Sequence, residues 1–199
     1  MTAPSRTAKI MNAQFKAFIK DDDEYLMATI DESDPKIWYF MVSGLLEPYA
    51  GGEYVFRLKA PDDFPQRPPE FEFVTPNGVY DVGGKICISI GEFHAKDAPK
   101  KDGATGWRAA LGMKGFAKQV VNGMIVPETL GGGIRILGAD AEECRQFAKD
   151  SQNYNSAKKY GRVAISRLLE GFDDFAKANP GLKACSRWIN NHPERFGDL

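Results

Sequence analysis

Residues 53–90 read EYVFRLKAPDDFPQRPPEFEFVTPNGVYDVGGKICISI, and they hold two strand patterns followed by a stretch without any regular pattern. Residues 53–60 alternate apolar and polar side chains, and residues 70–73 alternate again, which is typical of strands with one covered face. The proline-rich link between them is too short for a helical crossover, so we expect the two strands to pair antiparallel.

Upstream, the same kind of pattern continues. Residues 25–30 and 37–42 are strand-like, and the links between the strands are short and rich in turn residues, which favours an antiparallel meander. A sheet with one polar face needs a helix against its other face. Residues 8–19 repeat apolar side chains at steps of three and four, so they predict that helix, ending before Asp21 because negative charge is unfavourable at a helix C-terminus.

Downstream, residues 75–106 contain many glycines, one apolar cluster around Cys87 and no long periodic segment. Helical periodicity returns from Trp107 to Met124, and again over 139–159 and 163–175. We therefore predict an α+β fold: a four-stranded antiparallel meander with an N-terminal helix and C-terminal helices. We expect a main domain over residues 1–160 and a helical C-terminal extension over 161–199.

The composition excludes several classes of protein. Acidic residues number 27 and basic residues 26, so no basic excess favours nucleic acid as a partner. The chain has no apolar run long enough to span a membrane, and its N-terminus lacks the apolar core of a signal peptide. The three cysteines have no CxxC spacing, which argues against a disulfide framework or a metal site and favours a reducing, cytoplasmic setting. No cofactor is indicated.

Residues 61–90 resemble the ubiquitin-conjugating enzymes. The family's order is present: a strand ending in Pro61, the run FPQRPP, an aromatic strand, the pair Pro76-Asn77 and then the single Cys87. The sequence TPNG, the ten residues from Asn77 to Cys87, the run KICISI and His94 resemble the endoplasmic-reticulum-associated subclass, which is usually anchored by a C-terminal membrane helix. No such helix follows here, so a place on the cytosolic face of that membrane would require an anchor or partner outside this sequence.

The resemblance implies that Cys87 accepts ubiquitin from an activating enzyme as a thioester and passes it to a substrate lysine, or to a serine or threonine hydroxyl, with a ligase as a further partner. A thiolate suits this chemistry, since it is both a strong nucleophile and a good leaving group. Asn77 would stabilise the oxyanion or hold the flap that does so. His94 is our first choice to deprotonate the acceptor, ahead of Ser89, Glu92 and Asp97, and Phe64 and Gln66 are candidate ligase contacts.

Two alternatives remain open. The first is a ubiquitin-binding or scaffold variant of the same fold without catalysis; such variants usually lack the cysteine, so Cys87 is the discriminating feature. The second, a Cys-His protease, is a poor match because the chain has only two histidines and no evident orienting partner. We expect the Cys87 thiol to be reachable from solvent, and we expect Cys144 and Cys185 to be structural.

Overall fold

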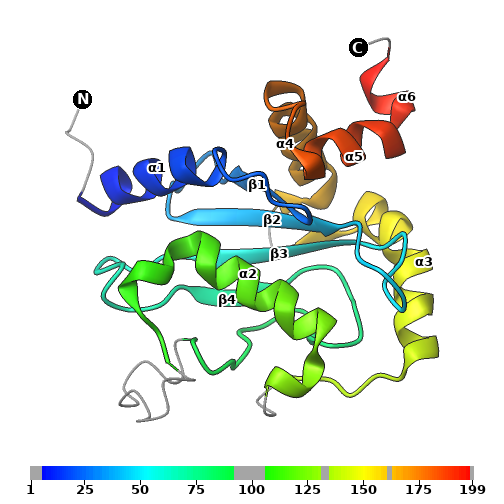
Figure 1. The fold of residues 1–199 in the computed structure, drawn as a ribbon, viewed down its shortest axis with the longest axis horizontal. Helices are drawn as coiled ribbons and strands as arrows, with labels where there is room; N and C mark the ends of the chain where they lie inside the picture. Colours follow the sequence, from blue (N-terminus) through cyan, green and yellow to red (C-terminus); the bar gives the residue numbers. More distant parts are fainter. Residues whose placement is uncertain (1–5, 92–105, 131–134, 161–162, 198–199) are drawn as a thin grey trace.

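The computed structural model describes residues 6–91, 106–130, 135–160 and 163–197 (Figure 1). Its four longer strands form one antiparallel sheet in the order β1-β2-β3-β4, and β5 pairs with β6 in a separate two-stranded sheet. The predicted α+β meander with an N-terminal helix and C-terminal helices is confirmed. In chain order the elements are α1 (Arg6–Phe18), β1 (Leu26–Ile30), β2 (Ile37–Ser43), β3 (Glu53–Lys59), β4 (Glu70–Phe73), η2 (Ala109–Leu111), α2 (Gly112–Ile125), η3 (Pro127–Leu130), α3 (Ala141–Ala157), β5 (Lys159–Tyr160), β6 (Val163–Ala164), α4 (Ile165–Ala178), α5 (Lys183–Asn191) and α6 (Pro193–Phe196).

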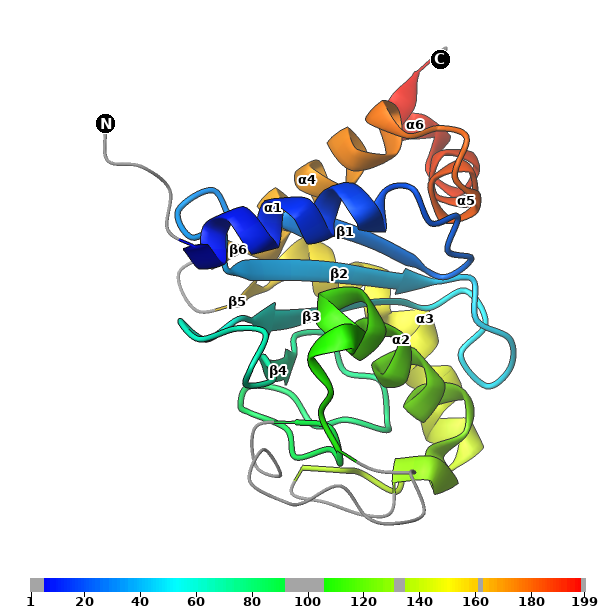
Figure 2. The same cartoon turned by 60° about the vertical axis from the view of Figure 1, so that its left-hand side comes forward.

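One face of the sheet is an aromatic layer. Phe40 of β2 stacks on Phe56 of β3 at a ring distance of 5.0 Å, and the registered neighbours along these strands share the same face. Helix α1 covers this layer through Phe15, whose ring meets that of Trp38 at 5.1 Å, and α2 covers it through Phe116. Both helices lie in front of the sheet in Figure 2.

The other face of the sheet is buried as well, so the expectation of a polar, uncovered face along residues 53–60 and 70–73 is wrong. Met27, Met41 and Val55 point to this side and are wholly buried. Helix α4 packs so closely on β1 that a Cβ atom added to Gly171 would lie 2.7 Å from Oγ1 of Thr29. In Figure 2, α3, α4 and the β5–β6 hairpin lie behind the sheet. The C-terminal half of the chain thus supplies a second layer.

Charged residues on this second face are tolerated because side chains from distant segments reach them. Arg57 of β3 forms an ion pair of 2.8 Å with Glu72 of β4, and its guanidinium lies over the ring of Tyr160 at 5.8 Å from the centroid. The Tyr160 hydroxyl donates a hydrogen bond to Glu72. The polar side chains that alternate along residues 53–60 therefore lie on a face that is covered by polar partners and not by water.

Helix boundaries differ from prediction where tertiary contacts intervene. The helix predicted from Trp107 begins at Gly112, whose φ of +59° interrupts helical geometry. Gln14 of α1 lies against Gly112, and its Oε1 accepts the N–H of Met113 at 2.9 Å, so a residue 99 positions away satisfies one of the first N–H groups of α2. The C-terminal tail, which has no clear pattern, forms α5 and α6.

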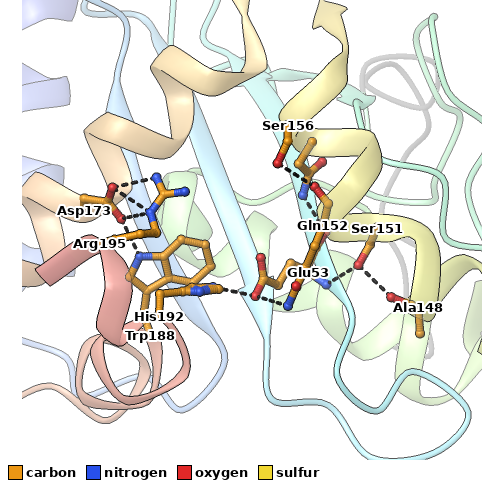
Figure 3. Close-up of polar contacts among 10 residues, drawn as sticks. Glu53, Ala148, Ser151, Gln152, Ser156, Asp173, Trp188, His192 and Arg195 are labelled. Atoms are coloured by element: carbon orange, nitrogen blue, oxygen red, sulfur yellow. Dashed lines mark hydrogen bonds and ion pairs between the residues drawn. The ribbon is translucent and has the colours of Figure 1, made fainter.

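A buried polar group, which we call the Glu53 cluster, joins β3 to α3 and to the C-terminal helices (Figure 3). The Glu53 N–H donates to Oγ of Ser151 at 3.0 Å, and its carboxyl oxygen Oε1 accepts from Gln152 at 2.9 Å and lies 2.7 Å from Nε2 of His192. The Glu53 carbonyl accepts from Asn155 at 2.9 Å. Burial raises the pKa of Glu53 to about 7 and lowers the pKa of His192.

A second set of polar contacts fastens α5 and α6 to α4. Asp173 of α4 accepts from Nε1 of Trp188 at 2.8 Å and forms an ion pair of 2.6 Å with Arg195 (Figure 3). Residues of α4 and α5 also belong to the same hydrophobic core as the sheet. The division of the chain at residue 160 stays a prediction. Among the described residues, no helix is both long and apolar enough to span a membrane.

Candidate active site

The turn after β4 is built around the side chain of Asn77, which is fully buried. Its Nδ2 donates to the carbonyls of Thr75 at 3.1 Å and Tyr80 at 3.2 Å, and its Oδ1 accepts the N–H groups of Val79 at 3.0 Å and Tyr80 at 2.8 Å. Both amide hydrogens are therefore already bonded to the backbone. Asn77 shapes this turn by the Asx-type bonding that asparagine makes to nearby backbone.

Gly78 allows the turn to approach α3. Its φ is +86°, and a Cβ atom there would lie 2.7 Å from Sγ of Cys144. A side chain would therefore be strained and would also clash with α3. Cys144 is buried, and burial raises the pKa of its thiol, which fits the structural role predicted for it.

The chain then returns along β4 towards Cys87. Val82 forms a bridge with Phe73, and the N–H of Ile86 donates to the carbonyl of Phe71 at 2.9 Å. Lys85 forms an ion pair of 2.9 Å with Glu70 of β4. The Asn77 turn leaves from the end of β4 and the approach to Cys87 runs beside the same strand, so β4 anchors both.

The Cys87 residue itself is only 7% exposed, less than the sequence led us to expect. Ile86 and Ile88 on either side of it are core residues, and none of the three cysteines forms a disulfide. Within the described ranges, no three His, Cys, Asp or Glu side chains are grouped to hold a metal ion.

The structure separates the two candidate ligase contacts. Phe64 is buried at 2% exposure, its ring 6.1 Å from that of Trp107, whose Nε1 donates to the carbonyl of Pro65 at 2.8 Å. The Phe64 ring is therefore not on the surface, where a ligase could touch it. Gln66 is exposed, and a ligase contact there stays a prediction. His94 lies outside the described residues.

Sequence reasoning missed two residues next to the site. Arg135 pairs with Asp81 at 2.8 Å beside the approach to Cys87, and Asn155 of α3 accepts the hydroxyl of Thr75 at 2.6 Å at the start of the Asn77 turn. Thr75 in turn accepts the N–H of Val55 at 3.0 Å. These partners lie 54 and 80 residues from the residues they hold, so no local pattern announces them. The only signal in the sequence is the glycine run just before Arg135.

Known proteins resemble the part of the chain that contains the sheet and the candidate site. Residues 10–159 match the family described as "Ubiquitin-conjugating enzyme". The chain is 26% identical over 155 residues to "Ubiquitin-conjugating enzyme E2 6" of Candida glabrata, covering 77% of this chain and 58% of that protein. It is 32% identical over 93 residues to "Ubiquitin-conjugating enzyme E2 J2" of Bos taurus, covering 46% of this chain and 36% of that protein. The chain thus spans less than two thirds of the length of these relatives.

Similarity to solved structures supports the fold. The structure of human ubiquitin-conjugating enzyme E2 G1 superposes with a TM-score of 0.51 at 24% identity, over 63% of this chain and all of that one.

Proposed function

Because the chain belongs to the ubiquitin-conjugating enzyme family, we propose that it is a ubiquitin carrier that works through Cys87. The observation that supports this most directly is the arrangement of Asn77 and Cys87. The turn built by Asn77 ends β4, and the cysteine follows a segment bonded to that strand. A non-catalytic variant would have no need for a thiol at this position.

The proposed reaction is two successive acyl transfers. The Cys87 thiolate attacks the carbonyl carbon of a ubiquitin thioester on the activating enzyme, whose thiolate leaves. An acceptor amine then attacks the new thioester, loses a proton and forms an amide while the Cys87 thiolate leaves. Each attack places negative charge on the carbonyl oxygen. Since the amide hydrogens of Asn77 are bonded within its turn, we assign Asn77 to holding this flap in place. We keep His94 as the candidate that deprotonates the acceptor.

A charging assay tests the proposal. The full chain is incubated with activating enzyme, ubiquitin and ATP, and the products are separated without reducing agent. We expect an adduct that thiol reagents remove, and we expect Cys87→Ala to abolish it. Cys144→Ala is the matched control, because Cys144 is buried in α3 and should leave charging intact.

Absence of an adduct under conditions that charge another carrier would refute the enzyme proposal. If ubiquitin then bound the wild type and Cys87→Ala with equal affinity, the scaffold alternative would be supported instead.

The acceptor, partners and location are extensions of the proposal. We propose ubiquitin, its activating enzyme and a ligase as partners, and lysine as the acceptor, with serine or threonine hydroxyls as the alternative. Mild hydroxylamine cleaves an oxyester and leaves an amide, so product bonds that all survive it would exclude hydroxyl transfer.

A reactive thiol is preserved best in the reducing cytosol, and we propose that the protein is located there, either at the endoplasmic reticulum or away from it. Cell fractionation with a fluorescent fusion would overturn this location if the protein appeared in the lumen.

A further inference from the structure

The segment that leads to Cys87 is held between two neighbours. On one side, Val82 forms a bridge with Phe73 of β4. On the other side, the N–H of Asp81 donates to the carbonyl of Arg135 at 3.0 Å, and Tyr80 forms an antiparallel bridge with Ile136. Residues 135–139 thus form a strand-like flank along residues 78–81, bringing a distant part of the chain beside the candidate active site.

Arg135 is unusual in its backbone. Its φ is +67°, and among the described residues it is the only one other than glycine with a positive φ. This conformation costs free energy in any residue with a Cβ atom, and it persists only where the surroundings impose it. Such strain is common at functional sites.

The Arg135 side chain reaches three points on the approach. Its guanidinium pairs with the Asp81 carboxylate at 2.8 Å and donates to the carbonyl of Val82. It also lies across Gly84, where an added Cβ atom would be 3.2 Å from its Cζ. Gly83 and Gly84 have no side chains of their own to restrict them. The guanidinium therefore holds a flexible glycine pair that ends three residues before Cys87.

We propose that Arg135 is a positioning residue for Cys87. It acts through the 81–84 turn: the guanidinium fixes this turn against residues 135–139, while the bond from Ile86 to Phe71 fixes the other end, so that the thiol of Cys87 is presented in one place. This inference rests on the proposed function. The positive φ of Arg135 is then explained, because this backbone conformation directs the guanidinium to the 81–84 turn.

The test compares Arg135→Gly with Arg145→Ala. Glycine adopts the φ of residue 135 without strain but removes the guanidinium. Arg145 is an arginine on α3 that also forms two ion pairs, with Glu47 and Glu142, and it serves as the matched control. Three measurements are made on each full-length variant: unfolding by denaturant, alkylation of each cysteine by iodoacetamide followed by mass spectrometry, and discharge of the ubiquitin thioester to free lysine at several lysine concentrations.

We expect Arg135→Gly to unfold at the same or higher denaturant concentration than the wild type. We expect Cys87 alkylation to become at least about fivefold faster, with Cys144 and Cys185 unchanged. The maximal discharge rate should fall at least about tenfold with the half-saturating lysine concentration unchanged, as expected when reacting atoms lose their alignment. Arg135→Lys, which keeps the charge opposite Asp81, should recover part of the rate.

Two results would overturn the proposal. One is an Arg135→Gly variant with wild-type alkylation and discharge. The other is a variant that is destabilised and alkylated faster at all three cysteines, which would mean that Arg135 only supports the fold. The alkylation experiment needs no ubiquitin. If the wild type fails to form a thioester, the proposed function fails, while the effect of Arg135 on Cys87 is still decided by the alkylation rates.

Discussion

Asn77 and Asn155 are two fully buried asparagines that support the same turn in opposite ways. Asn77 bonds backbone groups two and three residues away, whereas Asn155 bonds Thr75 and Glu53, which are 80 and 102 residues away. Thr75 connects the two, since its carbonyl accepts from Asn77 and its hydroxyl donates to Asn155. The turn beside the candidate site is therefore built locally and secured from a distance. The first contribution can be recognised in a sequence motif, and the second cannot.

Replacing Asn77 should give the largest effect on activity. In Asn77→Ala the bonds that close the turn are lost, so we expect the maximal discharge rate of the thioester to fall by about 10²-fold, the size expected for a misplaced reacting group. Hydrogen exchange should become faster at the Val79 and Tyr80 amides, whose acceptor is lost. Discharge assays and exchange measured by NMR would show this. Unchanged discharge would mean that the turn has no part in catalysis.

The matched change Asn155→Ala should affect stability instead. It leaves the Thr75 hydroxyl and the Glu53 carbonyl buried without these partners, so the free energy of unfolding should fall by about 3 kcal/mol. Denaturant unfolding provides the value. At a temperature where the variant stays folded, discharge should remain within about threefold of the wild type. A discharge defect as large as that of Asn77→Ala would remove the distinction between local and distant support.

The Glu53 cluster should make stability depend on pH. Burial raises the pKa of Glu53 to about 7 in the folded protein, well above its value in an unfolded chain. The folded state therefore holds this proton more tightly, and the stability that it contributes is present below about pH 4.5 and is lost as the pH rises through 7. Glu53→Gln cannot ionise, so it should be more stable than the wild type by about 2 kcal/mol at pH 8, and by much less at pH 5.

His192 gives the opposite trend, which Glu53→Gln should isolate. Because burial lowers the pKa of His192, the unfolded chain takes up a proton first as the pH falls below about 6.5, and stability decreases on the acid side. In Glu53→Gln the opposing contribution of Glu53 is absent. We therefore expect the free energy of unfolding of the variant, measured from pH 5 to 8, to decrease on the acid side. An equal loss of stability between pH 5 and pH 7 in wild type and variant would show that Glu53 does not carry this dependence.

Each polar contact of α5 should contribute only a small amount to the free energy of unfolding. Trp188→Phe replaces the buried indole with a smaller aromatic ring and removes the hydrogen bond to Asp173, which retains its ion pair with Arg195. We expect a loss of about 1 kcal/mol in the free energy of unfolding, measured by denaturant titration, and unchanged discharge. Asp173→Asn weakens both contacts and should cost more. If Trp188→Phe cost as much as Asn155→Ala, the polar bonds of the C-terminal helices would be as important as those behind the Asn77 turn.

The part of the fold that could be predicted follows from short-range pattern. The alternation over 70–73 and the apolar run over 37–42 predicted strands that the structure confirms within one or two residues at each end. Helix α3 was predicted over 139–159, and its N-terminus is set by a capping box in which Asp140 and Glu143 bond each other's backbone. In these segments, neighbouring residues supply the contacts that decide the conformation.

The errors came from contacts between distant segments. The charged residues of β3 were taken to face water, because nothing near residue 53 indicates that His192 will lie against it. The C-terminal extension was predicted to be helical, but the bounds of α5 and α6 within it were not predicted. The same holds for the start of α2, where Gln14 rather than a neighbouring residue accepts the N–H of Met113.

The amino-acid sequence alone determined the order of the four strands of the main sheet and of the helices around it, because alternation and helical period are properties of short segments. The resemblance of residues 61–90 to the family, which also rests on residues near one another in the chain, gave the candidate nucleophile. Only the tertiary structure decided that the charged face of β3 and β4 is covered, that Cys87 is almost buried, and that Arg135 and Asn155 hold the segments around it. These features depend on which side chains meet after the chain has folded, and a buried polar group is acceptable only when its distant partner is in place.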